Sequence, residues 1–250
     1  NSTLYTICSW IDAIVFALVA VYFINVYIFQ NYQIPTSSLE KTLRVGDFLC
    51  VNKMAYGARV PNTPLSMPLV QHTMPAFLGG GKSYFDNPQW EYKRLKGWDK
   101  VEKGDIVVFN FPTGDTVCTK RPNPDIYTHR YYNGKRMVEN RKDIYGEIVV
   151  RPVDRRENYV KRCVGTPGDT LQIIDNVIYI DGVAEPQHPY LQYNYIVKTD
   201  GYLLGNKYLT NLGVSKEDRI KLADGIYHFP LTAEMKAELE KNSHVLSIDI

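Results

Sequence analysis

The first 39 residues of this chain contain no Lys or Arg, and Asp12 is their only charged side chain. All 29 basic residues lie at Lys41 or later, although the whole chain of 250 residues has a formal net charge of only +2. So small an excess argues against a nucleic-acid partner recognised through bulk positive charge. The sequence thus joins a nearly uncharged head to a mildly basic body.

Cysteine and histidine are also scarce. The four cysteines are Cys8, Cys50, Cys118 and Cys163, and the five histidines are scattered. No two cysteines have the spacing of zinc ligands, so we expect neither a metal site nor another cofactor. A dense disulfide framework is excluded by the count. One bridge among the last three cysteines stays open, beside the alternative of buried free thiols.

A long apolar run makes up most of the uncharged head. Ile11–Phe29 is 19 residues long, and only Asp12 and Asn25 interrupt it. As a helix it would measure about 28 Å, close to the hydrocarbon thickness of a bilayer. The run therefore predicts a membrane helix over about 10–30 within an anchor at 1–33, with Asp12 at its edge. A buried core helix is one alternative; a signal-peptide core, the other, is shorter and follows basic residues.

After residue 40, short β-type runs alternate with turn signals, which favours a mainly β body. Thr232 can cap a helix over about 233–242. Asp175-Asn176 reads as a hairpin turn. The predicted strands are Leu49–Met54, Ile106–Phe111, Glu147–Val150, Tyr159–Val164, Leu171–Ile174, Val177–Ile180 and Val245–Ile250.

Two long segments do not fit the strand pattern. Residues 57–98 are rich in Gly and Pro and read as a surface excursion. Residues 120–158 are basic and contain Pro, which predicts a second protruding ribbon or loop. The expected organisation is a catalytic domain at 34–186 that carries both excursions, and an insertion-like segment at 187–250.

Three ordered motifs carry a family resemblance. They are IPTSSLEKTL at 34–43, GDFLCVNKMAYGARVP at 46–61 and YVKRCVGTPGD at 159–169. They resemble the boxes of type I signal peptidases, the bacterial membrane-bound serine proteases that remove signal peptides, and the longer loops are similar to those of the Bacteroidetes branch. The first box departs from the family pattern, with Leu39 for Met and Lys41 for Pro. The resemblance implies a mainly β fold: a transmembrane helix, an antiparallel β-sheet catalytic domain with inserted ribbons or loops, and a short C-terminal α/β segment.

The resemblance implies a Ser/Lys dyad in which Ser38 is the nucleophile and Lys161 the general base. A serine hydroxyl needs a base, and a lysine can serve only when it is neutral, so Lys161 needs a partly dry setting. The oxyanion donors would be the backbone N–H of Ser38 and the hydroxyl of Thr36. Ser37 is the rival nucleophile, and alignment to the box favours Ser38.

The resemblance also implies a substrate site that selects small residues at positions −1 and −3 of signal peptides. Plain core packing is the alternative role for Ile34, Leu43 and Val160. Two further turns, at 45–47 and 167–169, would shape the site. The implied substrate-binding residues are Tyr32, Ile34, Pro35, Leu39, Leu43, Tyr159 and Val160, and the supporting residues are Asp47, Arg162, Gly168 and Asp169.

The implied location is the bacterial inner membrane, with lipid as a partner, the catalytic domain outside the cytoplasm and no nucleic acid bound. The family's last box, G-D-N-R-x-N-S-x-D-S-R, is not found between 170 and 250. We therefore expect the chain to end before its protease domain is complete, so that residues 1–250 alone would not cleave a preprotein. The alternative is a catalytically inactive, membrane-tethered relative that acts as a binding or scaffold protein. No oligomeric state is implied.

Overall fold

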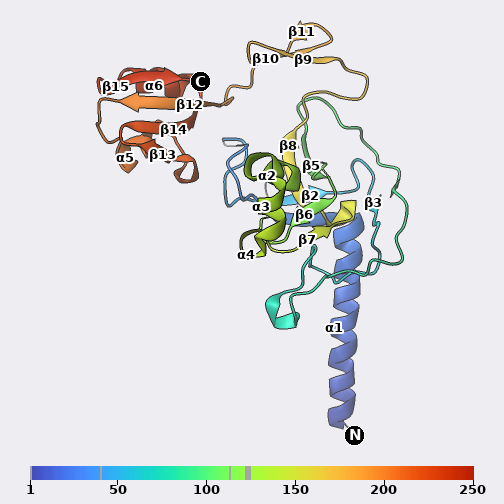
Figure 1. The fold of residues 1–250 in the computed structure, drawn as a ribbon. Helices are drawn as coiled ribbons and strands as arrows, with labels where there is room; N and C mark the ends of the chain where they lie inside the picture. Colours follow the sequence, from blue (N-terminus) through green and yellow to red (C-terminus); the bar gives the residue numbers. More distant parts are fainter. Residues whose placement is uncertain (1, 40, 113, 122–124) are drawn as a thin grey trace. The chain divides into compact units, whose positions relative to one another are not determined.

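The computed structural model describes residues 2–39, 41–112, 114–121 and 125–250 (Figure 1). Glu40 of the first motif and part of the predicted excursion at 120–158 lie outside these ranges. The described chain is mainly β, with one long N-terminal helix and several short helices. The predicted fold class is therefore confirmed.

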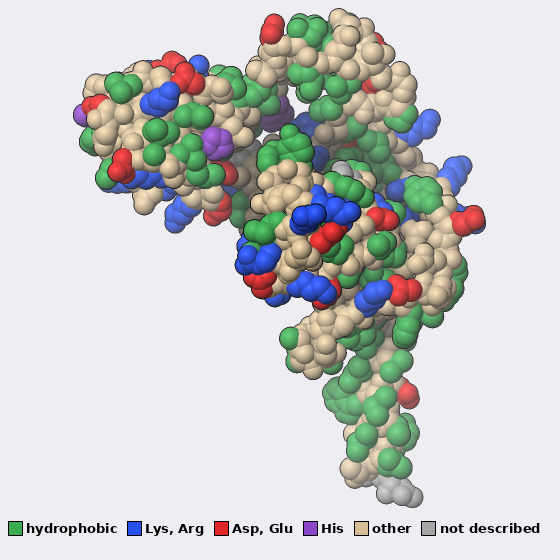
Figure 2. All heavy atoms as spheres, viewed as in Figure 1, with side chains coloured by type: hydrophobic (Ala, Val, Ile, Leu, Met, Phe, Trp, Pro, Cys, Tyr) green, Lys and Arg blue, Asp and Glu red, His purple; other side chains and the backbone are tan. Residues whose placement is uncertain are grey.

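The N-terminal helix α1 (Ser2–Tyr27) is long and apolar enough to cross a membrane, by its length and composition. Figure 2 shows hydrophobic side chains over its visible face. The predicted bounds of 10–30 were wrong at both ends. Residues 2–10 contain no charge, Gly or Pro that would stop the helix, so Asp12 lies inside α1 and not at its edge. At the other end, Phe29 already belongs to a strand.

The chain divides into two compact units. One comprises the residues up to Asn31 and Cys50–Thr166, and the other comprises Tyr32–Leu49 and Pro167–Ile250. Strands β1 (Phe29–Gln33) and β2 (Phe48–Asn52) are hydrogen-bonded neighbours in a two-stranded sheet. The catalytic domain placed at 34–186 by the sequence stays a prediction.

The first unit contains α1 and three small sheets of two strands each. Their pairs are β3 with β4, β5 with β8 and β6 with β7. The pairing of β3 with β4 closes the 57–98 excursion, which is otherwise mostly irregular and carries the 3₁₀ helix η1 (Ala76–Leu78). The bounds are β3 (Arg59–Val60), β4 (Lys93–Arg94), β5 (Ile106–Asn110), β6 (Thr116–Cys118), β7 (Ile148–Val150) and β8 (Asn158–Arg162).

The second predicted excursion, at 120–158, was wrong as a ribbon or loop. It holds three short helices, α2 (Ile126–Asn133), α3 (Lys135–Asn140) and α4 (Lys142–Tyr145), followed by β7 and the 3₁₀ helix η2 (Val153–Arg155). Asp125 caps α2 by accepting hydrogen bonds from two backbone N–H groups. Ile126, Val138 and Tyr145 of this segment form a small buried apolar cluster with Cys118 of β6. Helices of four to eight residues are too short to show a clear hydrophobic period in a basic sequence.

The second unit ends in a compact α/β module, residues 193–249. Its four-stranded sheet has the order β13-β14-β12-β15, and its core includes Phe229, Leu231 and Leu239, which are completely buried. A separate antiparallel sheet of β9, β10 and β11 precedes the module, with Asp175 and Asn176 at positive φ in the predicted hairpin turn. The bounds are β9 (Leu171–Ile174), β10 (Val177–Ile180), β11 (Val183–Ala184), β12 (Tyr193–Thr199), α5 (Asn206–Leu212), η3 (Lys216–Asp218), β13 (Ile220–Ala223), β14 (Ile226–Leu231), α6 (Ala233–Glu240) and β15 (Val245–Asp249).

Candidate active site

The first motif is joined to the start of the second by backbone hydrogen bonds. The N–H of Ile34 donates to the carbonyl of Asp47, and the N–H of Gly46 donates to the carbonyl of Ile34, both at 2.9 Å. The carboxylate of Asp47 accepts the N–H of Arg44 at 2.8 Å, and Gly46 has a φ of +95°. A residue with a Cβ rarely adopts that φ, so the predicted turn at 45–47 is confirmed and depends on its glycine.

Ser38 lies in a turn just after β1. Its side chain and that of Thr36 are exposed. Backbone hydrogen bonds from the N–H groups of Thr42 and Leu43 to the carbonyl of Leu39 continue the turn, at 3.0 and 2.8 Å. The segment therefore exposes the side chains of the predicted nucleophile, Ser38, and of the predicted oxyanion donor, Thr36.

The alternative nucleophile, Ser37, is hydrogen-bonded to a residue far away in the sequence. The hydroxyl of Ser37 donates to Oδ1 of Asp218, in η3, at 2.7 Å. Its proton is thereby directed to a carboxylate of the C-terminal module, within the same unit. This contact places Asp218 beside the motif, which the sequence did not reveal, and the choice between Ser37 and Ser38 stays a prediction.

Lys161 lies in β8, opposite Val107 of β5. The side chain is exposed by surface area, yet partial burial lowers the pKa of its ammonium from the ordinary value. A lower pKa increases the neutral fraction at a given pH, which is the form that a general base requires. The preceding Tyr159 and Val160 are half-buried, and the ring of Tyr159 meets that of Phe111 edge-on at 4.8 Å.

Arg162 supports the same strand from the other side. Its guanidinium donates to the carbonyl of Gly104 at 3.1 Å, in the turn that precedes β5. In that turn, Asp105 accepts the hydroxyl of Tyr56 at 2.7 Å and the N–H of Glu102 at 2.9 Å. The hydrogen bond to Asp105 raises the pKa of Tyr56 to about 12. Tyr56 belongs to the second motif, so this turn joins the second motif to the third.

The remaining predicted site residues differ in exposure. Ile34 is only 4% exposed, Pro35 is exposed, and Tyr32, Leu39 and Leu43 are half-buried. Burial raises the pKa of Tyr32 to about 12. Gly168 has a φ of +104° in the predicted turn that precedes Asp169, which confirms that turn.

Ser38 and Thr36 belong to one unit, and Lys161, Tyr159 and Val160 belong to the other. The pairing of Ser38 with Lys161 therefore stays a prediction from the sequence.

Lys53 was not singled out by the sequence, although it belongs to the second motif. Its ammonium donates to the carbonyl of Asn25 at 2.5 Å and to Oε1 of Gln30 at 2.7 Å. A cation at these last turns of α1 is favoured by the helix dipole. Burial nevertheless lowers the pKa of Lys53 to about 8. The missed signal is the one charged residue in the predicted strand Leu49–Met54.

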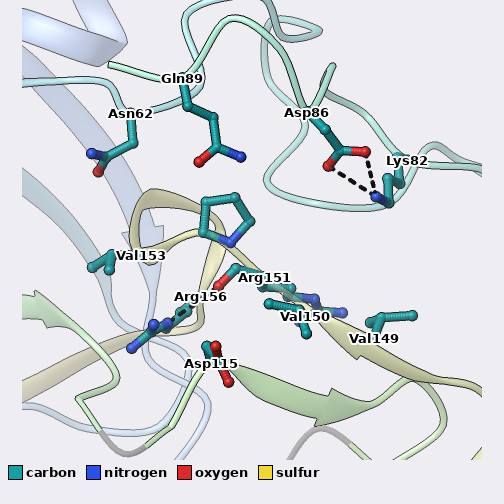
Figure 3. Close-up of a pocket in the computed structure, with 11 residues that line it drawn as sticks. Asn62, Lys82, Asp86, Gln89, Asp115, Val149, Val150, Arg151, Val153 and Arg156 are labelled. Atoms are coloured by element: carbon teal, nitrogen blue, oxygen red, sulfur yellow. Dashed lines mark hydrogen bonds and ion pairs between the residues drawn. The ribbon is translucent and has the colours of Figure 1, made fainter. Parts of the chain in front are cut away.

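A cavity of about 620 Å³ lies in the first unit, and none of the predicted site residues lines it (Figure 3). Figure 3 shows the ion pair of Lys82 and Asp86 at its edge. No group of three or more His, Cys, Asp or Glu side chains that could hold a metal ion occurs in the part of the chain that the structure describes. The lining residues are Asn62, Lys82, Asp86, Gln89, Asp115, Val149, Val150, Arg151, Pro152, Val153 and Arg156.

Comparison with known proteins agrees with the motifs. The model of the family "Signal peptidase, peptidase S26" matches residues 7–219. Signal peptidase I of Haemophilus influenzae is 28% identical over 62% of this chain and 32% of its own length. The enzyme of that name from Pseudomonas aeruginosa is 28% identical over 64% and 33%, and that of Buchnera aphidicola from Acyrthosiphon pisum is 24% identical over 80% and 44%.

The matched region thus spans from about a third to less than half of these relatives. No solved structure gives a significant match. The family model covers well over half of the chain and includes all three motifs. This chain belongs to the signal peptidase family, peptidase S26.

Proposed function

We propose that this protein is a membrane-anchored serine endopeptidase that removes signal peptides from exported preproteins, with Ser38 as nucleophile and Lys161 as general base. The observation that carries the proposal is the family match over residues 7–219, which contains every motif residue assigned a role. The exposed turn at Ser38 and the lowered pKa of Lys161 support it independently.

The proposed reaction is acyl transfer in two halves. Neutral Lys161 takes the proton of the Ser38 hydroxyl while Oγ attacks the scissile carbonyl. The N–H of Ser38 and the hydroxyl of Thr36 donate to the oxyanion, and Lys161 returns the proton to the leaving amine. Lys161 then takes a proton from the water that attacks the ester, and it returns this proton to Oγ of Ser38 as the bond to the new carboxyl end breaks.

Substrate selection is proposed to lie in shallow apolar pockets for the small residues at positions −1 and −3. Leu39, Leu43 and Val160 are half-buried, so each offers part of an apolar surface. Ile34 is almost wholly buried, which also suits core packing. The exposed Pro35 and the half-buried Tyr32 and Tyr159 would border the extended peptide.

The proposed anchor is α1, whose residues 3–19 are exposed although almost all are uncharged. Lipid would cover such a surface. Because signal peptides emerge from the membrane on its outer face, we propose the inner membrane as the location and the extracytoplasmic side for the catalytic part.

The test is cleavage of a preprotein by the full-length gene product in lipid vesicles. Ser38→Ala and Lys161→Met should each reduce kcat to background, a loss on the order of 10⁶ for a nucleophile or its base. Ser37→Ala should retain far more activity than Ser38→Ala. The exposed residues Lys142 and Ser243 provide the controls Lys142→Met and Ser243→Ala, which should leave the rate unchanged. The rate of the parent enzyme should rise with pH towards the lowered pKa of Lys161.

Two outcomes contradict the proposal. Full activity of Ser38→Ala or of Lys161→Met would exclude the dyad. A full-length protein that binds the preprotein but never cleaves it would instead support the inactive scaffold.

A further inference from the structure

The segment 61–81, called the apolar loop below, contains no Lys, Arg, Asp or Glu. Its largest side chains point outward: Leu69 is 73% exposed and Phe77 is 85% exposed. Leu65, Met67 and Leu78 are exposed as well. A run of exposed apolar side chains without charges is unusual on a surface that faces water, and it marks a contact site.

The base of this loop is fixed by a buried polar cluster. Thr63 is completely buried, and its N–H and hydroxyl both donate to Oδ2 of Asp154 at 2.9 Å. Arg155 donates to the carbonyls of Thr63 and Gln71 at 3.0 and 3.1 Å. These four residues, called the Arg155 cluster below, hold the apolar loop at Thr63, near its start, and at Gln71, near its middle.

The apolar loop is itself ordered by backbone hydrogen bonds. The N–H of Met67 donates to the carbonyl of Ser83 at 2.7 Å, and that of Met74 donates to the carbonyl of Gly81 at 2.8 Å. The loop's one ionisable side chain, His72, lies 3.2 Å from Glu157. Backbone hydrogen bonds therefore fix the loop with its apolar side chains exposed, and the imidazole of His72 lies beside Glu157.

The loop is also attached to α1. The hydroxyl of Tyr22 donates to the carbonyl of Pro64 at 2.7 Å. Tyr22 precedes the last helical residue, Tyr27, by five positions, which is about 7.5 Å along the helix axis. In the view of Figure 1, η1, which carries Phe77 and is drawn in turquoise, lies level with the middle of α1. The hydrogen bond between Tyr22 and Pro64 therefore holds the base of the loop beside the last turns of the apolar helix.

We propose that the apolar loop inserts into the bilayer leaflet in which α1 ends, as a second lipid contact of the unit that carries Lys161. This inference rests on the proposed membrane anchor. Its basis is proximity: the hydrogen bond between Tyr22 and Pro64 holds the charge-free loop beside α1, whose residues 3–19 are exposed. Interfacial segments of this kind insert aromatic and aliphatic side chains at the boundary between headgroups and acyl chains.

The test places a single tryptophan in the loop and measures its contact with lipid. The full chain carries Phe in place of Trp10, Trp90 and Trp98 and is reconstituted in phosphatidylcholine vesicles brominated near the carbonyl end of the acyl chains. The loop variant is Phe77→Trp. Its matched control is Tyr131→Trp, at a side chain 83% exposed in α2 of the same unit, and its membrane reference is Phe16→Trp in α1.

We expect bromination to reduce the fluorescence of Phe77→Trp at least about twofold, because the loop would lie among the brominated carbons. Tyr131→Trp should keep its fluorescence. If Phe16→Trp is quenched but Phe77→Trp behaves like Tyr131→Trp, the loop is covered by water, a second copy or another protein, and the inference is overturned while the anchor stands. If Phe16→Trp is not quenched either, the proposed anchor fails as well. Preprotein cleavage is scored separately.

Discussion

The C-terminal module and the apolar loop are stabilised in opposite ways. The module, residues 193–249, buries Val197, Phe229 and Leu231 completely between its sheet and α6. The loop turns its largest apolar side chains outward, and at its base the buried Thr63 is hydrogen-bonded to the buried Arg155 of η2. The module therefore has an apolar core of its own. In the loop, by contrast, polar interactions at the base hold a segment whose apolar side chains are exposed.

The largest expected effect is in the module. Phe229→Ala should destabilise it by about 3–5 kcal/mol, because the buried ring leaves a cavity beside Tyr227, whose ring lies 5.4 Å away. Amide hydrogen exchange measured by mass spectrometry should show lost protection across residues 193–249. Ile196→Ala, at a side chain 37% exposed in the same sheet, is the control and should cost much less.

The same hydrogen-exchange measurement tests whether the module and the apolar loop unfold independently. The module and the apolar loop belong to different units, so protection of residues 61–81 should not change in Phe229→Ala. An equal loss of protection in the loop would show that the two regions unfold as one.

The second effect is in the loop. Arg155→Met should cost about 3 kcal/mol, because Met fills the space but removes the hydrogen bonds to Thr63 and Gln71 and leaves Asp154 without its nearby guanidinium. Hydrogen exchange should rise within 61–81 and stay constant within 193–249.

A matched arginine elsewhere in the first unit controls for the loss of charge. Arg141 forms an exposed ion pair with Asp143 at 2.8 Å, and surface pairs of this kind contribute little. Arg141→Met should therefore leave exchange of the loop unchanged. A loop that stays protected in Arg155→Met would mean that the backbone hydrogen bonds alone hold it.

The contrast also explains what the sequence could predict. Short apolar runs and turn residues identified β9, β10 and their hairpin turn with correct bounds, and Thr232 marked the start of α6. Strands β12, β13 and β14 were missed because their apolar residues are interspersed with Tyr, Lys and His. The three helices after residue 125 were missed because each is shorter than three turns.

The candidate site was predictable only as separate motifs. The resemblance of the three boxes to those of the family implied Ser38 and Lys161, and Gly and Asp residues indicated the two turns. The contact of Ser37 with Asp218 spans 181 positions in the chain, and no local pattern encodes it. The Arg155 cluster was unpredictable for the same reason. Taken singly, Thr63 and Arg155 are residue types typical of a surface, and only the hydrogen bonds between them explain their burial.

The smallest effect is a pH dependence in the first unit. Lys53 has its pKa lowered to about 8 by burial, whereas the unfolded chain keeps the ordinary value of 10.5. Between these values the unfolded state binds one more proton, so stability should rise with pH, by about 2 kcal/mol from pH 8 to 9.5. Urea unfolding in detergent micelles, followed through Trp90 and Trp98, measures this slope. It should flatten in Lys53→Met and persist in Lys96→Met, an exposed control. The measurement stops below pH 10, because the raised pKa values of Tyr32 and Tyr56 reverse the slope there. An unchanged slope in Lys53→Met would assign it to another group, such as Lys161.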